Sequence, residues 1–159
     1  MKIKSILTVL DFSENTGRVL DYTAEFAKVE NSSIYLLHSE PPISGYAYVS
    51  PGLGYGGFLG FGEYASINQE IESIHLENDL HAMKVLKKQL EAKGLDVEIR
   101  LIQGDAAIEI EKAVQELKTD LIIMGSHRRG FFSSLLSDKP EEAVLRHCSC
   151  PILLVPEID

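Results

Sequence analysis

Five short apolar segments, spread along the whole chain, constrain its fold more than any other feature. They are rich in β-branched residues and are bounded by polar, Gly or Pro residues, which is typical of strands. They cover about 3–10, 33–38, 97–102, 121–124 and 151–155. Because several are apolar at nearly every position, they predict strands that are covered on both faces, as in a parallel sheet.

Segments with helical periodicity separate most of these strands. We expect helices over about 14–29, 66–93, 105–117 and 139–147. The first has Ser13 as its expected N-cap, and the second is expected to stop at Gly94. The apolar stripe expected on the first helix is Val19, Tyr22, Phe26 and Val29. This alternation predicts one α/β domain over residues 1–159, an open doubly wound five-stranded parallel sheet with helices on both faces.

A Gly/aromatic-rich region at about 41–65 interrupts the alternation. Seven of the twelve glycines lie within residues 41–62, with five Tyr and Phe residues between them. Because Gly disfavours regular elements, we expect a long loop that acts as a lid or contacts a protein partner. Residues 52–57 fit the pattern G-x-G-x-x-G. They do not directly follow a predicted strand, so we interpret this match as fortuitous.

The charge balance and the apolar pattern exclude some classes of partner. The chain has 15 Lys and Arg against 24 Asp and Glu, a net charge of −9. This gives no general attraction to nucleic acid or to anionic membranes, so we predict neither as a partner. No run approaches the roughly 20 apolar residues of a membrane span, and the start does not resemble a signal peptide. The expected location is therefore the cytoplasm.

The side chains that most often bind metals or catalyse reactions form no complete pattern. Cys148 and Cys150 are too close in sequence for an unstrained disulfide, so we expect reduced thiols. His75 and Asp79 are four residues apart and share a helix face, which by itself predicts only a solvated surface. There is no nucleophile elbow, Walker A run or H-E-x-x-H motif. We therefore expect no metal site and no catalytic residues.

The fourth predicted strand runs from Asp120 directly into Gly125, Ser126 and His127. In an open α/β sheet, ligands bind at the carboxyl ends of the strands. Gly lets the backbone approach a ligand closely, and the N–H groups after it can hold an anion. A tight exit from the strand with no ligand is the alternative interpretation.

Residues 120–127 and 142–155, including Glu-Ala-Val-Leu-Arg-His-Cys-Ser-Cys-Pro-Ile-Leu-Leu-Val, resemble the C-terminal signature of the universal stress protein family. Residues 6–14, Leu36-Leu37-His38 and Gln103-Gly104-Asp105 resemble further segments of that family. The chain is thereby identified as similar to its UspA-like single-domain members. The resemblance implies a Rossmann-like fold of the adenine nucleotide alpha hydrolase type. It also implies a role in the stress response through binding or regulation rather than catalysis.

The resemblance also bears on nucleotide binding. ATP-binding members have a phosphate motif of Gly, two residues, Gly, nine residues, then Gly followed by Ser or Thr. This chain keeps Gly125 but has Arg128, Asp138 and Lys139 at the other three positions. Bulky side chains block the close approach of phosphate to backbone, so we expect a member without the usual ATP loop. Asp11 matches the acidic residue that such proteins place near the ribose.

A nucleotide switch is the alternative. Arg and Lys side chains bind phosphate well and can replace backbone donors, so ATP or AMP is a candidate ligand, with slow ATP hydrolysis as the one enzymatic activity considered. Ser39 stands where the family often has a Val against the adenine. The candidate crevice comprises Asp11, Ser13, Ser39, Gly125, Ser126, Arg128, Arg129 and Lys139.

The last predicted strand is apolar, and we expect it at an edge of the sheet, where an apolar strand needs a cover. Members of the resembled family form dimers by pairing this strand with its copy in a second subunit. The resemblance therefore implies a homodimer with a two-fold contact. Its expected residues are Ile152, Leu153, Leu154 and Val155.

Overall fold

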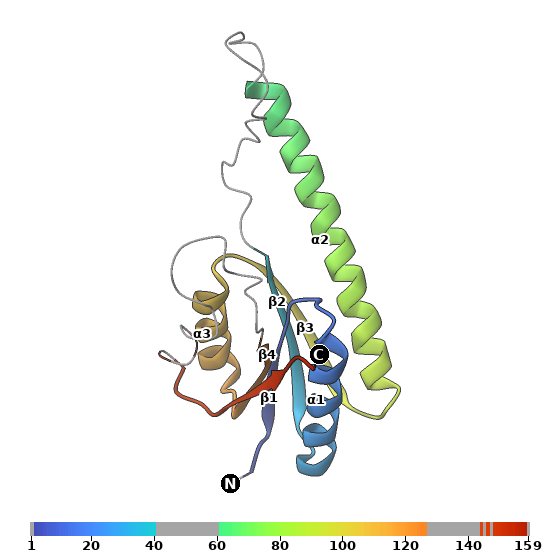
Figure 1. Ribbon diagram of the computed structural model, residues 1–159, viewed down its shortest axis with the longest axis vertical. Coiled ribbons are helices and arrows are strands. Elements are labelled where there is room, and N and C mark those ends of the chain that lie inside the picture. Colours follow the sequence, from blue (N-terminus) through green and yellow to red (C-terminus); the bar gives the residue numbers. More distant parts are fainter. Residues whose placement is uncertain (1, 41–60, 127–143, 145, 147, 159) are drawn as a thin grey trace.

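A five-stranded sheet organises the computed structural model, which describes residues 2–40, 61–126, 144, 146 and 148–158. The strands, all parallel, are β1 (Ser5–Leu10), β2 (Ser33–Glu40), β3 (Asp96–Gln103), β4 (Leu121–Ser126) and β5 (Ile152–Pro156). They lie in the order β3-β2-β1-β4-β5, and Figure 1 shows helices on both sides of this sheet. The helices are α1 (Thr16–Glu30), α2 (Phe61–Glu91) and α3 (Ala106–Leu117). The predicted α/β fold with a parallel sheet is confirmed.

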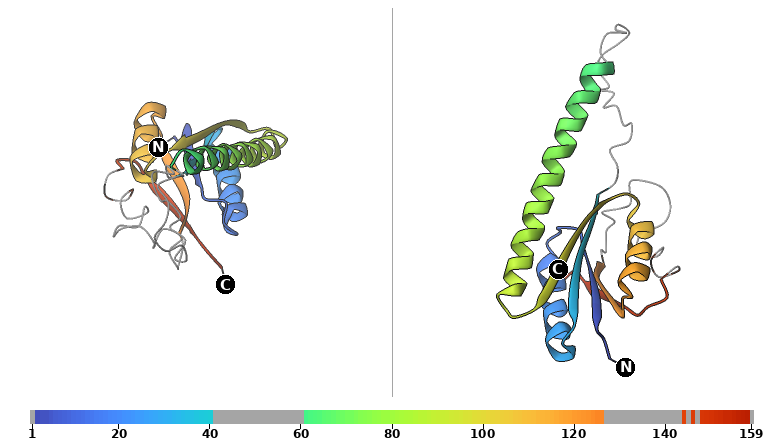
Figure 2. Two further views of the ribbon diagram at one scale, coloured as in Figure 1. Left: turned by 90° about the horizontal axis from the view of Figure 1, so that it is seen from above. Right: turned by 180° about the vertical axis from the view of Figure 1, so that it is seen from behind.

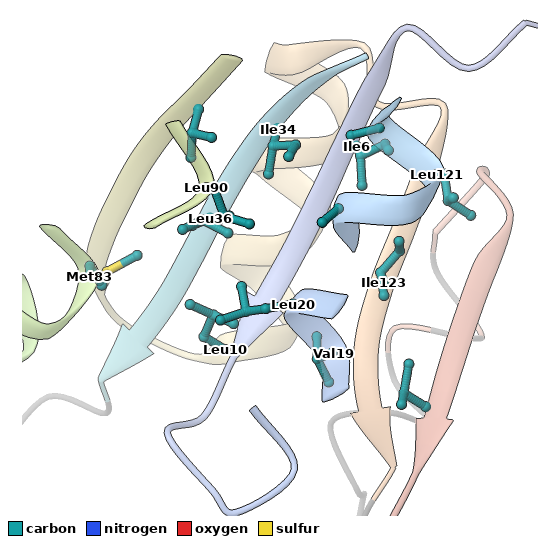
Figure 3. Packing of buried hydrophobic residues seen from close by; sticks show 14 residues of the cluster. Ile6, Leu10, Val19, Leu20, Ile34, Leu36, Met83, Leu90, Leu121 and Ile123 are labelled. Atoms are coloured by element: carbon teal, nitrogen blue, oxygen red, sulfur yellow. The ribbon is translucent and has the colours of Figure 1, made fainter. Parts of the chain in front are cut away.

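Both faces of the sheet are covered, and adjacent strand residues serve opposite faces. Ile6 and Ile123 pack with α1 and α2 in one core cluster, shown in Figure 3. Their neighbours Leu7 and Ile122 pack with α3 in the other cluster. All four side chains are fully buried. This two-sided burial explains why the strands are apolar throughout instead of at every second position.

The face that α1 buries differs from the predicted stripe. Tyr22, Phe26 and Val29 are 44%, 36% and 80% exposed, so only Val19 of that stripe was predicted correctly. The buried side chains of α1 are Val19, Leu20, Thr23, Ala24 and Ala27. Small side chains let the helix lie close to the sheet. The contact includes a buried hydrogen bond of 3.0 Å between the hydroxyl groups of Thr8 and Thr23.

Several predicted boundaries also need correction. The N-cap of α1 is Asn15, not Ser13. Helix α2 begins at Phe61, so residues 61–65 are helical and do not belong to a loop. Gly125 and Ser126 are the last residues of β4 rather than the start of a loop, because they pair with Val155 and Pro156. The predicted loop over 41–60 and most of the predicted helix over 139–147 lie outside the described residues.

Helix α2 is much longer than the face of the sheet that it covers. Among its side chains described from residue 73 onward, the buried core residues are Met83 and Leu90, which lie where the helix packs along β3. The helix ends close to Gly94, as predicted, and Gly94 has a φ of 80°, a conformation that favours Gly. The N-terminal part of α2 extends beyond the carboxyl edge of the sheet (Figures 1 and 2). No described helix is long and apolar enough to cross a membrane.

Candidate functional site

The candidate site lies at the carboxyl edge of the sheet, where the strand order reverses. From β1 the chain proceeds to β2 on one side, and β4 pairs with β1 on the other. Ligands of open α/β sheets bind at such a switch point. Asp11 follows β1 directly, and Gly125 lies near the end of β4. The topology therefore brings two of the predicted crevice residues to adjacent strand ends.

The turn after β1 is ordered by its own side chains. The Asp11 carboxylate accepts hydrogen bonds from the Ser13 backbone N–H at 3.0 Å and the Thr16 hydroxyl at 3.5 Å. The Ser13 hydroxyl accepts from the Asn15 backbone N–H at 3.3 Å. Phe12, between Asp11 and Ser13, has a φ of 54°, a backbone conformation that is costly for a bulky side chain. Asp11 and Ser13 therefore lie at the predicted edge and fix the shape of this turn.

The end of β2 is tied to the loop after β3. The Ser39 hydroxyl donates a hydrogen bond of 3.1 Å to the Gly104 carbonyl. The Gly104 N–H donates one of 2.8 Å to the Glu40 carbonyl. Ser39 is thus at the predicted edge, with its hydroxyl bonded to the backbone. The predicted residues Arg128, Arg129 and Lys139 lie outside the described part of the chain.

A cluster that the sequence analysis missed lies between β2 and α2. The His38 Nε2 atom is 3.6 Å from Asp79 Oδ2 and 3.9 Å from Glu40 Oε1. Burial and the neighbouring Asp79 carboxylate raise the pKa of the Glu40 carboxyl. The sequence did place His75 and Asp79 on one helix face, but nothing in it showed that β2 would bring an imidazole and a second carboxylate to that face.

Comparison with known proteins identifies the family. Residues 2–156 match the model of the universal stress protein family. The chain belongs to the universal stress protein family. The resemblance seen in the sequence is therefore confirmed, and it covers the strand ends that form the candidate site.

Two relatives match this universal stress protein over nearly their whole length. It is 29% identical over 154 residues to universal stress protein MJ0577 of Methanocaldococcus jannaschii, covering 96% of this chain and 94% of that protein. A solved structure of MJ0577 has a TM-score of 0.74 at 25% identity and covers 100% and 99% of the two chains. UspA of Lactobacillus plantarum has a TM-score of 0.73 at 16% identity and covers 98% and 99%.

Two further solved universal stress proteins carry adenine nucleotides. One, in complex with cAMP, has a TM-score of 0.58 at 18% identity and covers 98% of both chains. The other, from Archaeoglobus fulgidus in complex with dAMP, has a TM-score of 0.57 at 18% identity and covers 97% of this chain and 98% of its own. At this level of identity, the likeness shows a shared fold.

In this universal stress protein, β5 lies beside β4 at one end of the sheet, and its carboxyl end contacts α1. The Asn15 side-chain amide donates a hydrogen bond of 2.7 Å to the Val155 carbonyl, and the Arg18 guanidinium donates to the Pro156 carbonyl. These contacts tie α1 to β5. The side chain of Val155 is buried in the core, whereas those of Ile152, Leu153 and Leu154 are half-buried.

Proposed function

We propose that this universal stress protein acts by binding a ligand at the carboxyl edge of its sheet rather than by catalysis. The observation that carries this proposal is that polar side chains at that edge form hydrogen bonds with the backbone. Asp11 and Ser39 bond to backbone groups of the surrounding turns, and His38 bonds to the Leu10 carbonyl. Side chains held in this way shape a preformed binding site.

The second candidate function is an adenine nucleotide switch. Two observations favour it: Asp11 and Gly125 flank the switch point, and relatives with this fold have been solved with cAMP and dAMP. Both of those ligands are monophosphates. The residues Arg128, Asp138 and Lys139 replace the small residues that surround a triphosphate. We therefore propose that AMP-class nucleotides bind more tightly than ATP.

Restoring the phosphate motif tests both functions. In the triple variant Arg128→Gly/Asp138→Gly/Lys139→Ser, ATP is expected to bind at least about tenfold more tightly than in the wild type, which corresponds to about 1.4 kcal/mol. The reason is that Gly and Ser at these positions let phosphate approach the backbone closely, and we expect this gain to outweigh the loss of the two cationic side chains. Titration calorimetry with ATP and AMP measures the change, and phosphate release measures turnover.

The unaltered protein is expected to bind AMP more tightly than ATP and to show no ATP turnover above buffer. Asp11→Asn should weaken AMP binding if the nucleotide sits at the switch point. Wild-type protein that binds ATP as tightly as the restored variant would contradict the proposed loss of the ATP loop. ATP turnover by the wild type would contradict binding without catalysis.

We also propose a homodimer through β5. This strand is last in the sheet order, so its outer edge has no partner strand among the described residues. The Pro151 carbonyl accepts a hydrogen bond from the Ile122 N–H. Because ladder bonds alternate along a parallel strand, the backbone groups of Ile152 and Leu154 face outward. Half-buried apolar side chains along this free edge favour coverage by a second copy.

Leu154→Pro tests the dimer. Proline removes an outward N–H without removing a bond to β4. In a two-fold dimer it removes two hydrogen bonds between the subunits, each worth about 0.5–1.5 kcal/mol, so the dimer dissociation constant should rise by about tenfold or more. Leu154→Val keeps the N–H and serves as the matched control. Sedimentation velocity at micromolar concentration should show a dimer for the control and a monomer for Leu154→Pro. A monomeric wild type under the same conditions would contradict the dimer.

Two other proposals depend on the sequence alone. We propose that residues 41–60, which are rich in glycine and aromatic residues, contact a protein partner, since aromatic residues are enriched at protein interfaces. We also propose that the protein works in the cytoplasm. Both fit a stress protein that acts by binding.

A further inference from the structure

We propose that His38, Glu40 and Asp79 form a binding site for one divalent transition-metal ion. The site lies where α2 passes the carboxyl end of β2, on the far side of β1 from Gly125. It does not depend on the proposed ligand crevice, since no nucleotide takes part in it.

The spacing of the three side chains fits an ion between them. The three potential donor atoms all lie within 4.8 Å of one another. His38 Nε2 lies 3.6 Å from Asp79 Oδ2 and 3.9 Å from Glu40 Oε1. Two donors at about 2.1 Å from a tetrahedral zinc ion are about 3.4 Å apart. The two distances from His38 Nε2 exceed this value by only a few tenths of an ångström, and both are too long for direct hydrogen bonds.

The surroundings of His38 prepare its Nε2 atom for a metal. Its Nδ1 atom lies 2.7 Å from the Leu10 carbonyl oxygen, which can only accept, so Nδ1 carries the hydrogen. In the neutral ring, the lone pair then lies on Nε2, which faces the carboxylates. The Phe12 ring packs against the imidazole, with centroids 4.5 Å apart. A histidine that binds a metal through one ring nitrogen usually donates a hydrogen bond from the other nitrogen to a carbonyl or carboxylate, which fixes the orientation of the ring.

The pair of carboxylates from Glu40 and Asp79 favours a bound cation. Asp79 Oδ2 is buried and accepts no hydrogen bond from the described residues. Glu40 lies beside it, and burial and Asp79 raise the pKa of the Glu40 carboxyl. Two adjacent carboxylates repel each other when both are ionised. A bound cation would neutralise this repulsion and supply the partner that Asp79 Oδ2 lacks.

The donor set selects the class of ion. One imidazole and two carboxylates suit zinc or manganese, whereas calcium and magnesium prefer oxygen ligands alone. Three protein ligands also leave a coordination position open for water or an exogenous ligand. His75 lies one helical turn before Asp79, and a positive charge on it lowers the pKa of the Glu40 carboxyl. His75 is exposed, so we do not include it among the ligands.

The test is calorimetric titration of tag-free, nucleotide-free protein with Zn²⁺, and separately with Mg²⁺. We expect one Zn²⁺ per chain and Mg²⁺ binding that is weaker by about 100-fold or more. Asp79→Asn and Glu40→Gln, which keep the side-chain size, should each weaken Zn²⁺ binding by about 100-fold or more, since even residues outside the ligand shell change affinity 10–100-fold. His81→Ala removes an exposed histidine of the same helix and should leave Zn²⁺ affinity unchanged.

A second set of variants separates this site from the free thiols Cys148 and Cys150. Zn²⁺ binding should persist in Cys148→Ser/Cys150→Ser, and Zn²⁺ should raise the melting temperature of the wild type but not of Asp79→Asn. Circular dichroism verifies that each variant is folded. A wild type that binds no Zn²⁺ would overturn the proposal. So would Zn²⁺ binding that is lost with the two thiols and retained in Asp79→Asn.

Discussion

Replacing Ile123 with Ala is expected to lower the free energy of unfolding by about 2–5 kcal/mol. Ile123 lies in β4, is fully buried, and packs in the cluster formed with α1 and α2 (Figure 3). The members of this cluster come from helices and strands that the sheet holds in place, so they can collapse only partly into the space that the lost atoms leave. Urea denaturation, followed by circular dichroism, measures the change.

Ile108→Ala is the matched control for this substitution. Ile108 is 54% exposed on α3, so its truncation leaves no cavity and should change the free energy of unfolding by about 0.5 kcal/mol or less. Equal losses in the two variants would contradict the placement of Ile123 in a tightly packed core.

Asn15→Asp is expected to destabilise the protein by about 2–4 kcal/mol. Asn15 is 3% exposed, and its amide donates to the Val155 carbonyl at 2.7 Å. The substitution replaces that donor with an oxygen that repels the carbonyl, and it buries a charge. A negative charge at the start of a helix returns only about 0.3–1 kcal/mol, so the loss dominates.

The control for Asn15→Asp is Asn31→Asp, the same change at the exposed C-terminal cap of α1. Asn31 has a φ of 55°, which Asp also tolerates, and a negative charge at the C-terminal end of a helix costs about 0.3–1 kcal/mol, so we expect a loss of about 1 kcal/mol or less. Thermal denaturation of both variants at neutral pH compares the effects. An unchanged melting temperature for Asn15→Asp would show that the contact between α1 and β5 contributes little to stability.

The fold was predictable because the strand segments contain consecutive apolar residues, which indicate that both faces of the sheet are buried. In β2, Leu36 and Leu37 are both fully buried, yet they serve opposite faces of the sheet. Consecutive apolar residues of this kind occur when helices cover both faces, and the helical segments in the sequence supplied those covers. The same reasoning located Asp11 and Gly125 at the carboxyl edge, since that edge follows from parallel strand direction alone.

Helix faces and element ends were harder to predict because packing overrides local preference. Phe26 has the stronger hydrophobic character, yet Ala27 is buried, since a small side chain allows the close approach of α1 to β1. Ser13 is a good cap by type. However, the bond from its own N–H to Asp11 places it in the preceding turn, and the helix starts after Asn15.

The cluster of His38, Glu40 and Asp79 could not be predicted because its members are far apart in the sequence. His38 and Glu40 alternate with Ser39 on β2, which places them on one face of the strand. Asp79 reaches them only because of the angle at which α2 crosses the sheet. The helix packs on the sheet through Met83, one turn further along, and through Leu90, and no motif in the sequence indicates this placement.

Because α2 is long, a small movement at the candidate metal site would move the N-terminal end of this helix through a larger distance. Asp79 is near the point at which the helix leaves the sheet, and Phe61, the first residue of α2, is about 27 Å further along its axis at 1.5 Å per residue. The helix contacts β2 and β3 in its C-terminal part, and this contact is the pivot for any tilt of the helix. A tilt of about 5° at this pivot would displace the N-terminal end of α2 by about 2 Å, so a small change near Asp79 would produce a larger movement far from the sheet.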